Sequence, residues 1–358
     1  MLQKIYLSNF RSFEQKLLEF SPEITIIIGP NAAGKTNILE SIYLLSTGKS
    51  FKAGVESEMI RQGEEIARVK GKIDSEETET LEVVLTHGVI TRGNVQERTA
   101  KKRLLVNDVG KRLVDFAGRM PVVLFSPLEM DLISGSPSIR RKFLDFVLSQ
   151  VDREYRRSIL SYEKGLRSRN RLLLQIREEG TPRTQLAFWD RLLIKHGNYI
   201  TSARQEFIDF LNQSEQIWDE MMQVVYDRST ISEERLSKYE MQEVAAANTL
   251  VGPHRDDFQV RVKGQEGERV NEERDLGVYG SRGEQRMGVL WLKIGELKYI
   301  EEKSGQRATL LLDDIFSELD ERHRNIVNEV SKNQQTIITT ADEHFVEGFA
   351  YSDKILLE

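Results

Sequence analysis

Short apolar segments separated by turn residues run through the first third of the chain. Examples are "KIYLSNF", "EITIIIG", "TLEVVLT" and "PVVLFS", with Gly, Asp or Asn in the turns between them. Short runs rich in β-branched residues between such turns are typical of strands. The pattern therefore predicts a sheet-rich segment over residues 1–126.

The pattern changes over residues 127–248, where apolar residues recur at three- and four-residue spacing. In "IRRKFLDFVLSQVDREYRRSILSYEKGLRSRNRLLLQI" this spacing predicts long amphipathic helices. Gly180 and Pro182 mark a turn in "EEGTPRT". Strand-like segments return over residues 249–358, including "ATLLLDD" and "QQTIITT". We therefore predict one α/β lobe that is split in sequence by an inserted, mainly helical second lobe.

One stretch between an apolar strand and a helical pattern fits G-x-x-x-x-G-K-[ST] in full. Its residues are Gly29, Pro30, Asn31, Ala32, Ala33, Gly34, Lys35 and Thr36. Backbone N–H groups of such a loop surround a β-phosphate, while Lys35 is placed to reach the β- and γ-phosphates and Thr36 to ligate Mg²⁺. A glycine turn before a helix is the simpler interpretation, but the flanking strand and helix favour a site for ATP and Mg²⁺.

A pair of aspartates ends the apolar strand in "RATLLLDD". Carboxylates that follow a buried parallel strand emerge at the carboxyl edge of the sheet, beside the phosphate loop. Asp313 is predicted to hold Mg²⁺ through water, and Asp314 to orient or deprotonate the attacking water. Taken alone, the pair is better explained as a strand end before a turn, and only the phosphate loop favours the catalytic interpretation.

A second glycine-bracketed turn precedes a helical pattern in "GVYGSRGEQRMGVLW". It offers the Ser281 hydroxyl and the backbone N–H groups of a helix N-terminus, with Gly283 and Gln285 in the same turn. Such a terminus favours an anion. One nucleotide does not need two phosphate loops. We therefore expect this turn to meet the phosphate of an opposing chain, which predicts an ATP-dependent homodimer packed head to tail around two ATP molecules.

These motifs resemble those of a known family. "YGSRGEQRM" looks like the signature loop of ABC-type ATPases, "LLLDD" like their Walker B strand, and "SELD", which ends at Asp320, like their D-loop. With "NFRSF", "FSPLEMDLISGSPSIRRKFLD" and "GPHRDDF", the chain is similar over nearly its whole length to the RecF family. The resemblance implies a Rad50-like ABC-type head with a helical second lobe, and slow, DNA-stimulated ATP hydrolysis. It also implies dimerisation on double-stranded DNA, including single-strand/double-strand junctions, and work with RecR and RecO in loading RecA at gaps.

Some positions depart from the general ABC pattern. Asp314 replaces the usual glutamate, and this carboxylate is one methylene shorter, which is compatible with weak hydrolysis. Where a switch histidine is usual the chain reads "ITTAD", so that Thr340 is the predicted γ-phosphate sensor. The glutamine at the entry to the helical lobe is missing, and Ser126 or Glu129 stands there instead. Arg11 is expected near the nucleotide, although a solvated strand-end arginine explains it nearly as well.

The net charge of −6 requires any nucleic-acid surface to be local. Basic residues cluster in "RTAKKR" and over residues 138–177. The candidate DNA contacts are Arg98, Lys101, Lys102, Arg103, Arg140, Arg141, Arg156 and Arg157. Charge runs on helices are usually solvated faces, so the DNA interpretation depends on the resemblance. Such a surface would follow phosphates with little sequence preference and strong salt dependence.

The composition excludes several kinds of chemistry. The chain has no cysteine, which rules out disulfides, a thiol nucleophile and cysteine-ligated metal. It shows no signal-peptide pattern and no apolar run of the ~18 residues that a membrane span needs, so we expect a cytoplasmic protein.

Among related ATPases, a transporter subunit would have its phosphate and signature loops much closer together. An SMC-like chromosome-structural protein would need longer arms than the ~75 Å that two antiparallel helices reach here.

Overall fold

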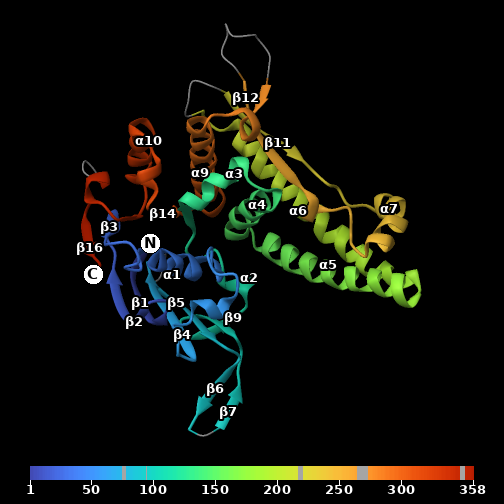
Figure 1. Cartoon of the computed structure of the whole chain (residues 1–358), viewed down its shortest axis with the longest axis horizontal. Coiled ribbons are helices and arrows are strands. Elements are labelled where there is room, and N and C mark those ends of the chain that lie inside the picture. Colours follow the sequence, from blue (N-terminus) through green and yellow to red (C-terminus); the bar gives the residue numbers. More distant parts are fainter. Residues whose placement is uncertain (75–77, 94, 217–220, 264–272, 347–350) are drawn as a thin grey trace. The chain divides into compact units, whose positions relative to one another are not determined.

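The computed structural model describes residues 1–74, 78–93, 95–216, 221–263, 273–346 and 351–358. These residues form two compact units (Figure 1). Unit 1 contains Met1–Glu129 and Glu296–Glu358, and unit 2 contains Met130–Gly295. Unit 1 is therefore assembled from the two ends of the chain, and unit 2 is inserted between them.

Unit 1 contains a six-stranded antiparallel sheet in the order β2-β1-β4-β5-β8-β9. Its strands are β1 (Leu2–Phe10), β2 (Phe13–Glu19), β4 (Ile66–Ile73), β5 (Glu79–Thr86), β8 (Lys102–Val106) and β9 (Val109–Lys111). Burial alternates along β4, as expected for a sheet with one face on a core. Helix α1 (Lys35–Thr47) packs on the buried face, where a Cβ at Gly71 would lie 2.5 Å from Leu45 Cδ1. The hairpin of β6 (Val89–Arg92) and β7 (Val95–Arg98) extends from this sheet (Figure 1).

Unit 1 also contains a parallel five-stranded sheet in the order β10-β14-β15-β3-β16. Its strands are β3 (Ile24–Ile28), β10 (Val122–Phe125), β14 (Thr309–Asp313), β15 (Thr336–Thr340) and β16 (Asp353–Leu356). Ile26, Leu311 and Ile337 are fully buried, since a parallel sheet is covered on both faces. The strand order places the carboxyl ends of β14, β15 and β3 side by side. The shorter elements along this part of the chain are η1 (Glu56–Met59), α2 (Leu113–Phe116), η2 (Pro127–Met130), η5 (Ile315–Glu318), α10 (Glu321–Ser331) and η6 (Glu343–Val346).

Unit 2 is built mainly from helices. They are α3 (Asp131–Ser134), α4 (Pro137–Val151), α5 (Arg153–Glu179), η3 (Arg183–Gln185), α6 (Leu186–Gln213), α7 (Glu233–Ala246), η4 (Pro253–Arg255), α8 (Leu276–Tyr279) and the first part of α9 (Arg282–Ser304). Asp152 caps α5 by accepting hydrogen bonds from the backbone N–H groups of Glu154 and Tyr155. Gly180 ends α5 in the left-handed conformation, which confirms the predicted turn. Helices α5 and α6 then pack side by side (Figure 1).

A three-stranded sheet extends unit 2 further along the chain than the pattern predicts. Its strands are β11 (Met221–Asp227), β12 (Asp257–Lys263) and β13 (Glu273–Asp275). β12 pairs with β11, and Phe258 of β12 lies against Phe143 of α4 with 6.3 Å between ring centroids. The second part of unit 1 begins at Glu296, whereas the sequence pattern predicts that the second part of the ATPase lobe begins at residue 249. The sequence pattern predicts a strand after residue 249, but it does not show to which sheet that strand belongs.

Candidate nucleotide site

The phosphate loop connects β3 to α1 and is bridged by its own lysine. Lys35 Nζ donates to the carbonyl oxygens of Gly29 (2.7 Å) and Pro30 (3.0 Å), and Lys35 is buried. Gly34 has a φ of 99°, and a Cβ there would lie 2.6 Å from Phe13 Cζ, so that this position requires glycine. The loop is therefore held tightly at the N-terminus of α1, where an anion is favoured.

Thr36 and Asp313 meet although they are 277 positions apart in the sequence. Thr36 Oγ1 donates to Asp313 Oδ1 at 3.0 Å, which joins the first turn of α1 to the end of β14. Burial raises the pKa of the Asp313 carboxyl, and the hydroxyls of Thr339 and Thr36 oppose this shift. A hydroxyl and one carboxylate suit Mg²⁺, which in nucleotide sites takes its other ligands from phosphates and water. The two predicted metal ligands therefore fit a magnesium ion.

Thr339 belongs to this site, although the sequence pattern did not single it out. The register of β14 and β15 pairs Thr339 with Asp313, and Thr339 Oγ1 donates to Asp313 Oδ1 at 2.8 Å. The predicted sensor, Thr340, uses its hydroxyl to donate to the carbonyl oxygen of Asp342 at 2.9 Å. Successive side chains of a strand face opposite sides, so that only one of the two threonines can meet Asp313. The strand register, which the sequence alone does not contain, was the missing signal.

Asp314 directly follows Asp313 in a left-handed turn, with φ 49° and ψ 29°. Its backbone N–H donates to the carbonyl oxygen of Thr339 at 3.1 Å, and its carbonyl oxygen accepts from Ser317 Oγ at 2.9 Å. Its side chain is only partly buried, unlike that of Asp313. These backbone contacts hold the turn that places a partly exposed carboxylate directly after the buried Asp313, and the water-orienting role of Asp314 stays a prediction.

The D-loop residue Asp320 caps α10 and holds a histidine. Its carboxylate accepts from the backbone N–H of His323 at 3.0 Å and lies 2.6 Å from His323 Nδ1. The hydrogen bonds from His323 lower the pKa of Asp320. The Asp320 side chain is 62% exposed. The observed contacts of Asp320 are therefore structural, and its predicted contact with nucleotide stays a prediction.

Arg11 lies in the turn between β1 and β2, but its guanidinium is already committed. Nε and Nη2 donate to the two carboxylate oxygens of Glu40 at 2.7 and 2.6 Å, and Nη1 donates to the carbonyl oxygen of Glu58 at 2.7 Å. The residues of this turn that approach Gly34 are Ser12 and Phe13. Arg11 thus fastens the turn to α1, and its predicted place near the nucleotide stays a prediction.

The second loop lies in unit 2 and begins α9 with a capping box. Glu284 N donates to Ser281 Oγ at 3.3 Å, and Ser281 N donates to Glu284 Oε2 at 2.6 Å. A hydrogen bond from Arg274, with further bonds from Ser281, lowers the pKa of Glu284 to about 2. The Ser281 hydroxyl keeps its own hydrogen to donate. Within the part of the chain that the structure describes, a Cβ at Gly283 would meet only Ser281 Oγ, at 4.0 Å, so these residues leave space for a ligand at the helix start.

In the structure, Gln285 contacts backbone atoms around its own loop, and its predicted contact with nucleotide stays a prediction. Its Nε2 donates to the carbonyl oxygens of Leu276 (3.2 Å), Gly277 (3.4 Å) and Gly280 (3.2 Å). The side-chain amide therefore ties α8 and the following turn to α9. Gln285 positions the loop that carries Ser281, and this contact was not visible in the sequence because it is made to backbone atoms.

Five of the eight basic residues predicted to contact DNA form hydrogen bonds or ion pairs within the chain. Arg140 is 9% exposed, so that its predicted DNA contact is corrected to an internal ion pair. The internal pairs are Arg140 Nε with Asp257 at 2.6 Å, Arg141 with the Asp256 carbonyl at 2.8 Å, Arg156 with the Ser149 carbonyl at 2.6 Å, and Lys102 with Glu56. The exposed candidates are Arg98, Lys101 and Arg103 in unit 1 and Arg157 in unit 2, of which Arg157 pairs with Glu154.

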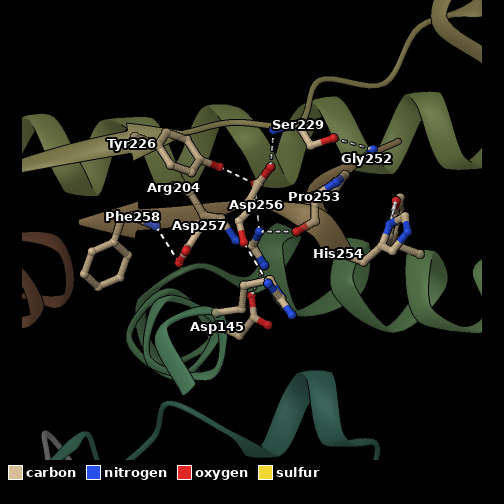
Figure 2. Close-up of polar contacts among 12 residues, drawn as sticks. Asp145, Arg204, Tyr226, Ser229, Gly252, Pro253, His254, Asp256, Asp257 and Phe258 are labelled. Carbon is tan, nitrogen blue, oxygen red and sulfur yellow. Dashed lines mark hydrogen bonds and ion pairs between the residues drawn. The ribbon is translucent and has the colours of Figure 1, made fainter. Parts of the chain in front are cut away.

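The stretch "GPHRDDF" contributes to a buried polar network in unit 2 (Figure 2). Arg204 of α6 is 1% exposed and donates to Asp256 at 2.9 Å and to Asp145 at 2.7 Å. The Asp256 carboxylate also accepts from the Tyr226 hydroxyl and the backbone N–H of Ser229. Burial raises the pKa of Asp256, and Arg204 opposes that shift. The network joins α4, α6 and both ends of the β11–β12 connection, so that these residues stabilise unit 2.

The Arg204→Met variant is expected to lower the free energy of unfolding of unit 2 by about 3–5 kcal/mol, because it leaves the buried carboxylate of Asp256 and the partly buried carboxylate of Asp145 without their cation. Urea denaturation followed by circular dichroism measures this change. Arg191→Met, at an exposed position of the same helix, is the matched control and should change stability by no more than about 0.5 kcal/mol. Equal stability of the two variants would contradict a supporting role for the network.

The phosphate loop, the acidic strand end beside it and the capped signature loop define a P-loop ATPase head of the ABC type. The family model described as "RecF/RecN/SMC N terminal domain" matches residues 1–356. The "DNA replication and repair protein RecF" of Herpetosiphon aurantiacus is 33% identical, over 95% of this chain and 93% of that protein. The protein of the same description from Caldanaerobacter subterraneus subsp. tengcongensis is also 33% identical, over 97% and 96%. The chain belongs to the RecF family.

Solved structures agree with this assignment and with the predicted fold class. The structure described as "the recombination mediator protein RecF-ATP in RecFOR pathway" has a TM-score of 0.84 at 31% identity, over 95% of this chain and 92% of that chain. The Smc head domain of Pyrococcus furiosus has a TM-score of 0.52 at 15% identity, which shows a shared fold. Among the described residues, no helix is both long and apolar enough to cross a membrane.

Proposed function

We propose that the chain is an ATP-dependent, DNA-binding recombination mediator. It binds ATP and Mg²⁺ in unit 1, dimerises on ATP, and binds double-stranded DNA at gaps or junctions. It hydrolyses ATP slowly and acts with RecR and RecO to promote RecA loading. The hydrogen bond of 3.0 Å between Thr36 and Asp313 carries the nucleotide part of this proposal, because it unites two motifs that serve a metal-bound phosphate. The descriptions of the relatives as DNA replication and repair proteins, and of one as part of a RecFOR pathway, support the DNA part.

Five residues of unit 1 have separate roles in the proposed ATP hydrolysis. Lys35 brings a positive charge to the β- and γ-phosphates. Thr36 and Asp313 would hold Mg²⁺, which neutralises phosphate charge when it is bound. Thr339 keeps the Asp313 carboxylate oriented through its hydroxyl. Asp314 orients the attacking water or accepts its proton, and its short side chain is consistent with slow turnover.

The Asp314→Asn variant is expected to bind ATP and to dimerise, but to release phosphate at least about 10²-fold more slowly. The amide has the size of the carboxylate and cannot take a proton, while Asp313 still serves the metal. Phosphate release and light scattering on the same sample measure the two effects. The control is Glu321→Gln, an exposed carboxylate at the start of α10. Rapid turnover in Asp314→Asn would move the catalytic role to another group.

The open helix start at Ser281 supports the dimer. The Ser281 hydroxyl and the space at Gly283 are suited to a phosphate, yet unit 1 already holds a complete phosphate loop. In the proposed dimer, Ser281 of one chain meets the γ-phosphate of ATP bound to the other chain. Light scattering in ATP, in ADP and without nucleotide tests this proposal. We expect dimers in ATP alone, and a monomer in all three conditions would overturn it.

The exposed residues Arg98, Lys101 and Arg103 are the proposed DNA contacts of unit 1. Replacing all three by Ala should weaken binding to a gapped duplex and reduce the slope of log K against log [salt] by about 2.7, since each lost phosphate contact contributes ~0.9. Fluorescence anisotropy at several salt concentrations measures the slope. A triple Ala variant of the exposed residues Arg191, Lys195 and Lys238 removes the same charge from unit 2. Equal slopes for the two triple variants would reject this surface.

A further inference from the structure

Two large apolar side chains are exposed immediately before the signature loop. Val278 is 68% exposed and Tyr279 is 72% exposed, and they end helix α8 just ahead of Ser281. Leu276, in the same short helix, is fully buried. Val278 and Tyr279 adjoin each other, and contiguous exposed apolar surface marks interaction sites more often than single exposed residues do.

This patch is presented by a rigid segment. The Asp275 side chain accepts a hydrogen bond from Gly277 N at 2.8 Å, which caps α8. A Cβ at Gly277 would lie 2.7 Å from the carbonyl oxygen of Ile133. Helix α8 therefore packs directly on the backbone of α3. The amide of Gln285 ties the same segment to α9. Val278 and Tyr279 are therefore held outward by the fold, in a fixed relation to Ser281.

We propose that Val278 and Tyr279 pack against a second copy of this chain, beside the nucleotide that Ser281 meets there. The inference rests on the proposed ATP-dependent dimer. Two residues of extended chain span at most ~7 Å, so that the surface that receives Ser281 also lies within reach of Tyr279. Tyrosine is enriched among the residues that dominate interface affinity, and a two-fold dimer buries the patch twice. The patch therefore sets the affinity of the dimer and leaves nucleotide binding by the single chain unchanged.

The Tyr279→Ser variant tests this role through the dimer affinity in ATP. We expect dimerisation at least about tenfold weaker than in the unchanged protein, with the same affinity for a fluorescent nucleotide under monomeric conditions. Tyr279→Phe keeps the ring and should retain the dimer. Phe188→Ser is the matched control, because Phe188 is a 59% exposed aromatic residue at the start of α6. Unchanged dimerisation of Tyr279→Ser would overturn the inference.

The absence of cysteine from the chain allows a direct second test. In the Tyr279→Cys and Phe188→Cys variants, the introduced thiol is the only one in the protein, and its rate of labelling with a maleimide reports its exposure. Because Tyr279→Cys also loses the ring that strengthens the dimer, labelling is measured at a protein concentration at which light scattering shows this variant to be dimeric in a slowly hydrolysed ATP analogue. There, the analogue should slow labelling of Tyr279→Cys at least about tenfold and leave Phe188→Cys unchanged. Adding Lys35→Ala should abolish this protection. If the analogue produces dimers and Tyr279→Cys still reacts at its original rate, the inference fails and the dimer stands. If the unchanged protein forms no dimer, both fail.

Discussion

The Lys35→Ala variant is expected to lose ATP-dependent dimerisation and to hydrolyse ATP at least about 10²-fold more slowly. Lys35 Nζ lies within the phosphate loop, 2.7 Å from the Gly29 carbonyl and 3.0 Å from that of Pro30. Its removal takes away the positive charge that the β- and γ-phosphates require. A coupled ATPase assay measures the rate, and light scattering in ATP measures the association.

Lys49→Ala is the matched control for this prediction. Lys49 is an exposed lysine just beyond the other end of α1, so that its replacement removes the same charge without touching the loop. The control should dimerise and turn over ATP as the unchanged protein does. If Lys35→Ala forms dimers in ATP as readily as Lys49→Ala, the loop between β3 and α1 is not the site that gates association.

The parts of the site that lie within one continuous segment were predictable from the sequence. The apolar run before Gly29 forms β3, the residues from Lys35 onward form α1, and the apolar run before Asp313 forms β14. Each of these elements depends on local periodicity and on glycine where the backbone needs it, as at Gly34. The contact between Thr36 and Asp313 was also predictable, because the carboxyl ends of all parallel strands in one sheet lie at the same edge.

The parts that depend on register or on backbone partners were not predictable. Nothing in "TIITT" distinguishes Thr339, which meets Asp313, from Thr340, which bonds within its own turn. The basic residue Arg140 reads as a surface charge, but it pairs internally with Asp257 in β12. Partners so far apart in sequence are set by packing, so that charge alone overestimates the surface available to DNA.

Replacement of Ser281 should separate binding of ATP from association. Ser281→Arg places a bulky side chain at the helix start, and Ser281→Asp keeps an N-cap acceptor but adds a negative charge facing a phosphate. Both variants should bind a fluorescent ATP analogue as a monomer with unchanged affinity, because the phosphate loop of unit 1 is intact. Both should lose dimerisation and ATP turnover. The Asp variant controls for loss of the helix cap, which alone is expected to cost about 1 kcal/mol of stability.

The central claim is that the two loops act on one ATP from different chains, and mixing two inactive variants tests it most directly. Ser281→Arg chains supply an intact phosphate loop, and Lys35→Ala chains supply an intact Ser281, so that each mixed dimer contains one complete site. Steady-state ATPase activity of the mixture should rise well above the sum of the two separate proteins. It should reach at most about half of the unchanged rate, since neither variant pairs with itself and each mixed dimer has one working site of two. Activity of the mixture equal to that sum, together with loss of nucleotide binding by isolated Ser281→Arg chains, would place both loops in the same chain's pocket and contradict the account.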